Sequence, residues 1–292
     1  MTPGSVSAGV PGAGLGTQSA PSCDAGSGRV GAAASSAPDA SVADAWRDGA
    51  GGSSASAAGS TADAAAASSA GTGAAPGAGC AGVTFALCED FESGVLDTKV
   101  WKLTQSKGTV TLDASRAARG STHSVHVHVE PGSDTMVGLT ESKTFPALAS
   151  GLFARAFIFI PNTMTSSLFI GDRHSRLIYA QGANPEGEYA LGIWNGGLIQ
   201  NHYSTSDDSQ DTKMLPPFDQ WFCLEYELDS AAGNVKAYLN DREITALRHE
   251  GWPAANIDSL MFGVDRYGSF PVAEDIWFDD LVVDSKRIGC TR

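Results

Sequence analysis

The sequence predicts an all-β fold, a sandwich or jelly roll, that follows a long low-complexity segment. From residue 100 onward, apolar and polar residues alternate with a period of two, which is typical of half-buried strands. These runs are rich in β-branched and aromatic residues and are separated by Gly, Pro, Asn and Asp. Because no segment carries an amphipathic helical stripe longer than two turns, many short strands must supply the core.

Residues 1–79 consist mostly of alanine, glycine and serine, and Leu15 and Trp46 are among their few large apolar side chains. Such a stretch cannot bury enough apolar surface to offset its chain entropy, so we expect it to be a disordered linker. The interspersed glycine, serine and proline argue against an alanine-driven helix. We expect the folded domain at residues 80–292, a suitable size for one all-β domain.

Seven segments of this domain have the character of strands. In chain order they are 109–113, 123–129, 153–160, 188–194, 222–228, 234–240 and 275–283. Asn240 and Asp241 stand between "KAYL" and "REI", which predicts a two-residue hairpin turn.

The chain has five cysteines, of which Cys23 lies in the expected linker. The other four form no C-x-x-C zinc pair, and two disulfides among them would suit an oxidising compartment. Cys80 with Cys88 would close a short loop, and Cys223 with Cys290 would fix the C-terminal segment. A Cys88–Cys290 bond remains open as the alternative.

The formal net charge is −14, and most of it belongs to residues 80–292. An acidic chain without a basic run is a poor candidate for binding nucleic acid. No apolar run is long enough for a membrane span, and no basic segment followed by an apolar one opens the chain. We nevertheless expect an extracellular or cell-surface protein, exported by a signal upstream of Met1 or by another route, and a monomer.

"HSVHVHV" (123–129) places His126 and His128 on one face of a strand. Val125, Val127 and Val129 would point into the core and leave both imidazoles facing solvent. Because no third ligand follows at a recognisable spacing, we interpret the pair as solvent-facing side chains and not as a metal site.

Several segments together resemble the core domain of a fungal cellulose-induced secreted protein, the Cip-type core. They are "EDFESG", "GTVTLD", "GSTHSVHV", "ARAFIFI", "FCLEYEL", "GNVKAYLN", "FGVDRYG" and "IWFDDLVVDSKRIGC". The resemblance covers residues 85–290 and is most specific at its two ends. That core is similar to glucuronan and alginate lyases, which implies a concanavalin-like β-jelly roll.

The resemblance also implies one structural calcium ion. Calcium binds several hard oxygens, both carboxylates and backbone carbonyls. If the first and last strands lie side by side, Glu92 comes near Asp279, with Asp280 as a further candidate. The turn "ARGSTHS" would supply carbonyls from around Arg119 and His123. The alternative is an unliganded, solvated acidic edge.

Lyases of this fold cleave polyuronates by β-elimination, so the resemblance implies an acidic polysaccharide as partner. The reaction requires a group that neutralises the uronate carboxylate, a base and an acid. Arg155 and Gln181 are candidates for neutralisation, and Tyr267 is the preferred acid or base. His174 and Arg176 lie near the family's His-x-Arg pair, displaced by a residue or two. A slip of one residue turns a strand side chain to the other face.

Two other functions remain open. The domain could be a non-catalytic carbohydrate-binding module that stacks sugars on Trp194, Tyr203 or Trp252. It could also be a calcium-stabilised adhesion domain. No E-x-D-x-x-E run of the kind found in laminarinase-like jelly rolls is present, so hydrolysis is the least favoured chemistry.

Overall fold

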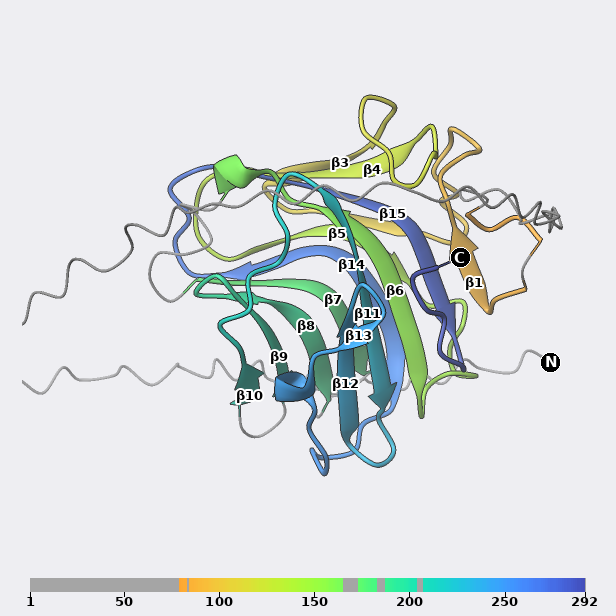
Figure 1. The fold of residues 1–292 in the computed structure, drawn as a ribbon, viewed down its shortest axis with the longest axis vertical. Helices are drawn as coiled ribbons and strands as arrows, with labels where there is room; N and C mark the ends of the chain where they lie inside the picture. The colour runs from red at the N-terminus through yellow and green to blue at the C-terminus, as the bar shows by residue number, and fades with distance from the viewer. Residues whose placement is uncertain (1–78, 83, 165–172, 183–186, 204–206, 292) are drawn as a thin grey trace, which may run out of the picture. The chain divides into compact units, whose positions relative to one another are not determined.

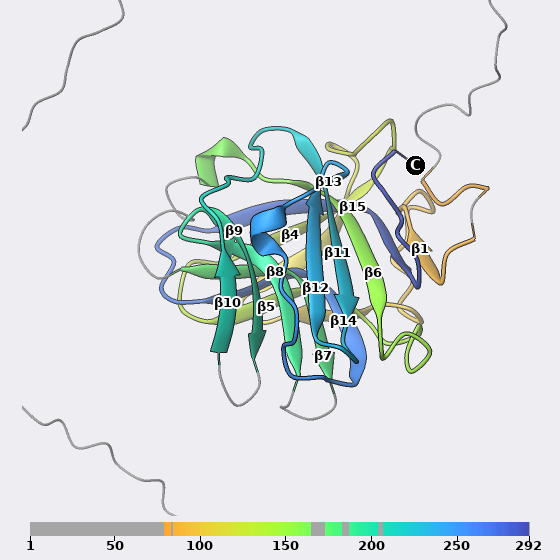
Figure 2. The ribbon, with the colours of Figure 1, turned by 60° about the horizontal axis from the view of Figure 1, so that its bottom comes forward.

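The computed structural model describes residues 79–82, 84–164, 173–182, 187–203 and 207–291. The expected linker, residues 1–79, lies outside the described residues apart from Gly79. In the described part, fifteen strands and two short 3-10 helices form two stacked sheets in which all paired strands are antiparallel (Figures 1 and 2). The all-β sandwich predicted from the sequence is confirmed.

The first sheet has eight strands, in the order β13-β12-β11-β6-β15-β4-β3, and β1 also pairs with β15. Their bounds are β13 (Arg242–Glu243), β12 (Asn234–Leu239), β11 (Trp221–Asp229), β6 (Leu152–Phe159), β15 (Glu274–Asp284), β4 (Ser124–Val129), β3 (Gly108–Asp113) and β1 (Leu87–Glu89). The first and last strands of the described residues, β1 and β15, are therefore neighbours, which is the condition that the expected calcium site requires.

The second sheet has seven strands, in the order β10-β9-β8-β7-β14-β5-β2. Their bounds are β10 (Asp207–Asp211), β9 (Gly197–Tyr203), β8 (Glu188–Trp194), β7 (His174–Gly182), β14 (Ile257–Tyr267), β5 (Thr135–Glu141) and β2 (Lys102–Gln105). The 3-10 helices η1 (Asn162–Met164) and η2 (Thr245–Leu247) lie in connections.

The core lies between the two sheets and follows the alternation of the strands. In β4, Val125, Val127 and Val129 are fully buried, whereas His126 and His128 face outward, as the sequence predicts. Each buried valine contributes roughly 1.5 to 3 kcal/mol relative to an exposed one. The inward faces of both sheets belong to one continuous apolar cluster.

The predicted hairpin turn joins β12 to β13. Asn240 and Asp241 both have positive φ, 49° and 68°. Two central residues with positive φ match the twist of an antiparallel hairpin, and Asn and Asp tolerate that conformation better than most residues.

Two disulfides are present, Cys80–Cys88 and Cys223–Cys290. The alternative Cys88–Cys290 bond is therefore excluded in this structure. Cys290 also donates its backbone N–H to Asp241 Oδ1 at 2.8 Å. The second bond thus fixes the C-terminal segment against β11 and the hairpin turn.

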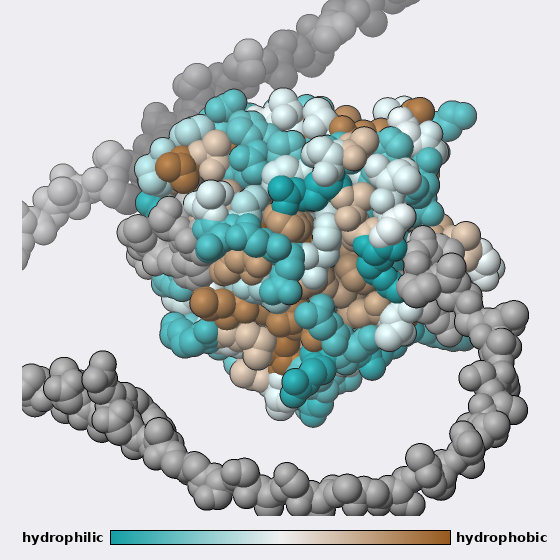
Figure 3. Space-filling view, turned by 45° about the horizontal axis from the view of Figure 1, so that its top comes forward, coloured by the Kyte–Doolittle hydropathy of each residue, from teal (hydrophilic) through white to brown (hydrophobic). Residues whose placement is uncertain are grey.

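The surface of the domain is mixed. Figure 3 shows one face, on which hydrophilic residues surround a smaller group of hydrophobic ones. The large hydrophobic side chains that are exposed, among the described residues, are Val95, Tyr203, Met214, Leu215, Tyr267 and Val272. None of the helices in the described part of the chain is long and apolar enough to cross a membrane.

Candidate functional site

A cleft of about 690 Å³ opens on the second sheet, on the face turned away from the core. Its wall is built by strands β7, β8, β9, β10 and β14. The lining residues are His174, Arg176, Glu188, Trp194, Ile199, Asn201, Tyr203, Ser209 and Tyr267.

The register of the strands explains why these side chains share one face. His174 pairs with Tyr267 on one side and with Trp194 on the other, so the three residues form a row across the sheet. Two residues further along β7, Arg176 pairs with Asp265 of β14. Residues two apart on a strand point the same way, so the second row lies directly beside the first.

A β-bulge in β7 places the side chain of Gln181 on the same face of the second sheet as that of Arg176. The pairing of β7 with β8 shifts by one residue between Arg176 and Ile178. The extra residue reverses the alternation, so Gln181 shares a face with Arg176 despite the odd spacing between them. Gln181 pairs with Glu188 and donates its amide to Glu188 Oε1 at 3.5 Å, beside the residues that line the cavity.

Arg176 is the central residue of the cleft. Its Nη1 donates to Glu188 Oε2 at 3.1 Å and to Asp265 Oδ2 at 3.2 Å. Its guanidinium carbon lies 4.7 Å from the ring centroid of Tyr267 and 4.8 Å from that of Tyr179. The side chain is only 7% exposed. A charge this buried requires such partners, because desolvation without them costs several kcal/mol.

His174 and Tyr267 have shifted pKa values that fix their protonation states at neutral pH. Burial, and then the charge of Arg176, lowers the pKa of His174 to about 4, so its imidazole is neutral at pH 7. Its Nε2 is buried without a hydrogen-bond partner. Burial, and then the carboxylate of Asp265, raises the pKa of Tyr267 to about 12, so its phenol keeps the proton. The two rings lie 6.1 Å apart, centroid to centroid.

Asp265 is a second unusual group in this cleft. Burial raises its pKa to about 6, although Arg176 opposes that shift. Tyr267 donates its hydroxyl to Asp265 Oδ2 at 3.4 Å. On β9, Asn201 Oδ1 is buried in the cleft wall without a partner. The wall therefore offers several unsatisfied or titratable polar atoms to a ligand.

The structure does not bring Arg155 to this cleft. Arg155 lies on β6 and faces outward from the first sheet, whereas its neighbours Ala154 and Ala156 face the core. Its Nη1 donates to the carbonyl of Gly289 at 3.0 Å, and its Nη2 to the carbonyl of Asp280 at 3.3 Å. The side chain is fully buried and ties the C-terminal segment to β15.

The aromatic residues that were expected to stack on sugars do not all lie in the cleft. Trp194 and Tyr203 line the cleft, and Tyr203 is 46% exposed. Trp252 is buried and stacks on His202 and His249, with ring centroids 5.7 and 4.4 Å away. Trp252 is thus part of the core and presents no ring face to a sugar.

Four carboxylates gather where β15 changes its neighbours, a region that we call the acidic junction (Asp90, Glu92, Asp279 and Asp280). β15 pairs with β4 up to Phe278 and with β1 from Leu281 onward. On the other side, its pairing with β6 shifts between Asp279 and Val282. Asp280 has a φ of 48°, a conformation that non-glycine residues seldom adopt and that often marks functional positions.

Two of these carboxylates contact the same loop, residues 118–123. Ala118 donates its N–H to Asp279 Oδ2 at 2.8 Å. Thr122 and His123 donate theirs to Glu92 Oε1 at 2.7 and 3.0 Å. Arg119, in the same loop, has a φ of 48° and donates its Nη1 to the carbonyl of Cys290 at 2.9 Å.

The donors of the acidic junction fit a hard cation. Asp280 Oδ1 is buried and has no hydrogen-bond partner. A Cβ added to Gly79 would lie 2.7 Å from that oxygen and 2.6 Å from the Cβ of Asp90, so both side chains line one narrow space. Burial, with additions from Asp280 and Glu92, raises the pKa of Asp279 to about 8. Carboxylate oxygens are the ligands that calcium prefers.

Fold and site together define a jelly-roll domain with a polar cleft on one sheet and an acidic junction on the other. The family model described as polysaccharide lyase-like, Cip1-like core domain, matches residues 90–286. The chain therefore belongs to this family, and its function is related to carbohydrates. The two disulfides and the family fit an extracellular protein.

Other comparisons are more distant. No curated protein matches this sequence. The binding domain of botulinum neurotoxin serotype G has a TM-score of 0.48 and 12% identity, with 70% of this chain and 49% of that chain covered. A sialidase has the same score and identity, with 70% of this chain and 19% of that chain covered. The chain thus spans about half of the toxin domain, and likeness at this level carries no functional argument.

From the sequence we propose His174, Arg176 and Tyr267, which line the cleft, but not Glu188 or Asp265, which contact Arg176. One signal for Asp265 was available, because it precedes Tyr267 by two residues and must share its face of the strand. Nothing in the sequence around Glu188 distinguishes it from a solvated strand carboxylate.

Proposed function

We propose that this domain is a polysaccharide lyase that cleaves a uronic-acid polymer by β-elimination. One observation carries the proposal. A neutral imidazole with a buried, unpartnered nitrogen (His174) and a protonated phenol (Tyr267) flank one guanidinium (Arg176) in a single cleft. Membership of a polysaccharide lyase-like family supports it.

The reaction needs three groups, and the cleft offers one for each. The neutral imidazole of His174, which lines the cleft, accepts the proton from C5 of the uronate, and the electrons of that C–H bond form the C4–C5 double bond. The C4–O bond breaks, and Tyr267 donates its proton to the leaving oxygen. Arg176, helped by the amide of Gln181, neutralises the uronate carboxylate and so makes the C5 proton acidic.

A carbohydrate-binding module is the second candidate, and the aromatic residues of the cleft favour it. Trp194 and Tyr203 line the cavity at the two ends of β8 and β9. Aromatic faces bind sugars without any need for a base or an acid. In that case, His174 and Tyr267 only hold hydrogen bonds to a bound saccharide.

Calcium binding at the acidic junction is the second part of the proposal. Glu92, Asp279 and Asp280 would hold the ion, and the backbone around Arg119 and His123 would complete the set. Asp90 joins them because it shares a narrow space with Asp280. A bound calcium ion supplies positive charge where four carboxylates meet, and so stabilises the pairing of β1 with β15.

The test of the lyase is an assay of the full chain on a panel of polyuronates, which follows the ultraviolet absorbance of the unsaturated product. Tyr267→Phe removes one hydroxyl and little packing, so we expect a loss of kcat of about 100-fold or more with little change in KM. Tyr203→Phe is the matched control, because this tyrosine lines the same cleft and has no role in proton transfer; we expect nearly parental activity.

Equal activity of Tyr267→Phe and the parent would reject the assignment of Tyr267. If the parent binds a polyuronate but forms no unsaturated product, and Trp194→Ala loses that binding, the binding module is the correct function.

A further inference from the structure

Two histidines and an aspartate converge on the outer face of the first sheet, on the opposite side of the sandwich from the cleft. His126 and His128 point outward from β4 because the valines between and beside them fill the core. Asp275 of β15 pairs directly with His128, so its carboxylate lies over the same face. The third ligand that the sequence around the two histidines lacks thus comes from a strand about 150 residues away.

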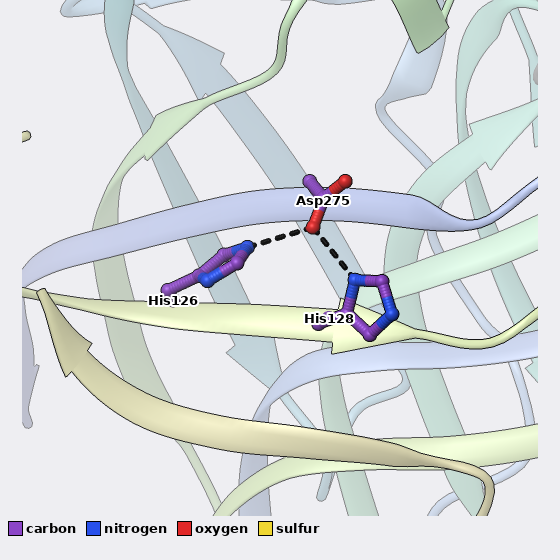
Figure 4. A group of neighbouring side chains, drawn as sticks. All are labelled: His126, His128 and Asp275. Carbon is purple, nitrogen blue, oxygen red and sulfur yellow. Dashed lines mark hydrogen bonds and ion pairs between the residues drawn. The ribbon is translucent and has the colours of Figure 1, made fainter.

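The ligand atoms of this group, the His-His-Asp cluster, are close together. Asp275 Oδ1 lies 2.8 Å from His126 Nε2 and 2.8 Å from His128 Nδ1 (Figure 4). Figure 4 shows the carboxylate between the two rings, with one nitrogen of each ring turned toward it. The three ligand atoms all lie within 4.8 Å of one another. No other group of three such side chains meets this criterion among the described residues.

Neighbouring residues hold both rings in place. The ring of His126 stacks on Trp277 at 4.3 Å between centroids and 10° between planes. Trp277 is itself fixed by the hydrogen bond from its Nε1 to Asp113 Oδ2, 2.6 Å long. The remaining nitrogen of His128, Nε2, lies 3.5 Å from Glu130 Oε1. Such outer contacts to the second ring nitrogen are typical of metal-binding histidines, since they orient the ring and set its tautomer.

We propose that His126 Nε2, His128 Nδ1 and Asp275 Oδ1 bind one divalent ion of borderline softness, with Zn²⁺ as the representative. Two imidazoles and one carboxylate are a common set of three protein ligands for zinc, at about 2.0 to 2.2 Å, with water at the fourth position. The side chains are 23%, 29% and 38% exposed, so an ion and its water can reach them. Calcium would not select this cluster, because it prefers oxygen ligands.

The experiment is calorimetric titration of the full chain with ZnCl₂, after removal of metals and in saturating Ca²⁺ to fill the acidic junction. We expect one saturable site. His126→Gln and His128→Gln should each weaken binding by about 10-fold or more, and the double variant should lose it. His249→Gln is the matched control, because this histidine stacks on Trp252 outside the cluster, and should bind zinc as the parent does.

Thermal melting and Co²⁺ substitution are two further measurements. Melting shows whether each variant is folded, and the Co²⁺ spectrum reports the ligands of the bound ion. The parent should melt at a higher temperature in Zn²⁺, and its Co²⁺ form should show visible bands of a nitrogen-ligated, low-coordinate ion. Asp275→Asn should lose both effects. The proposal is overturned if the parent shows no saturable zinc binding, or if the double variant binds zinc as tightly as the parent. It is equally overturned if a parallel titration shows zinc binding only when Ca²⁺ is left out, since the ion would then lie at the acidic junction.

Discussion

Arg176 keeps its positive charge in a wall that is almost closed to water, and two carboxylates compensate it. Glu188 and Asp265 both accept from the same nitrogen, Nη1. A uronate carboxylate that enters the cleft must therefore compete with these partners for the guanidinium. Asp265 controls this competition, because its pKa is raised to about 6 and its charge therefore changes near neutral pH.

This competition predicts a pH dependence. Asp265 is ionised above a pH of about 6 and neutral below it, so a falling pH releases Arg176 from one anionic partner. His174 stays neutral until the pH approaches about 4. We expect kcat/KM on a polyuronate to rise by up to about tenfold as the pH falls from about 7 to about 5, and to fall again at lower pH.

Asp265→Asn should remove most of that rise, because its side chain carries no charge at any pH. Asp258→Asn, an exposed position on the same strand, should keep the parental profile. A profile of Asp265→Asn that matches the parent would show that another group controls the competition.

The position of β15 in the first sheet allows a prediction of how calcium affects the thermal stability of the domain. Its acidic junction links β15 to β1 and to loop 118–123. A ligand at about 100 times its Kd adds about 2.7 kcal/mol, which raises the Tm of a domain of this size by roughly 5 to 10 °C. Asp279→Ala should lose this rise in scanning calorimetry with Ca²⁺ and with chelator.

Asp284→Ala is the control for the calcium experiment, because Asp284 ends the same strand outside the junction. It should keep the calcium-dependent rise. If Asp279→Ala stays as sensitive to chelator as the parent, the ion is held elsewhere.

Some elements could be predicted from the sequence and others could not, for a physical reason. β4 and β11 show clear alternation or strong strand composition, and both were expected. β14 and β7 were not, since each presents apolar residues on both faces. On β14, Phe262 faces the core while Met261 packs outward against Tyr179 and Ala190. A strand covered on both faces loses the period of two by which a strand is recognised.

The directions of the side chains around the candidate site could not be predicted from the sequence either. The bulge after Arg176 places Gln181 on the same face of the sheet as Arg176. No residue type in "HSRLIYAQG" indicates that a bulge is present. Arg155 was expected to neutralise the uronate carboxylate, but it lies on the other sheet. Its guanidinium donates instead to the carbonyl of Gly289 in the C-terminal segment, which covers this strand. Contacts between segments so distant in sequence cannot be read from local spacing.

For the whole molecule, the boundary between linker and domain stays a prediction. We expect limited proteolysis of the full chain to remove residues 1–79 and to leave a resistant fragment that begins near Cys80, because the first segment lacks core-forming side chains. Mass spectrometry of the resistant fragment, with its disulfides intact, gives its first residue. A resistant fragment from within residues 1–79 would contradict the prediction.

The pairing of β1 with β15 also governs how the domain responds to a pull on its two ends. Leu87 lies opposite Val283, so the chain arrives and departs at the same end of an antiparallel pair. The two disulfides decide where such a pull enters the domain, because Cys80 is bonded to Cys88 of β1 and Cys290 to Cys223 of β11. The load therefore crosses the first sheet from β1 through β15 and β6 to β11. Mechanical force would thus strain the acidic junction early, while the cleft, on the other sheet, stays outside the path of the load.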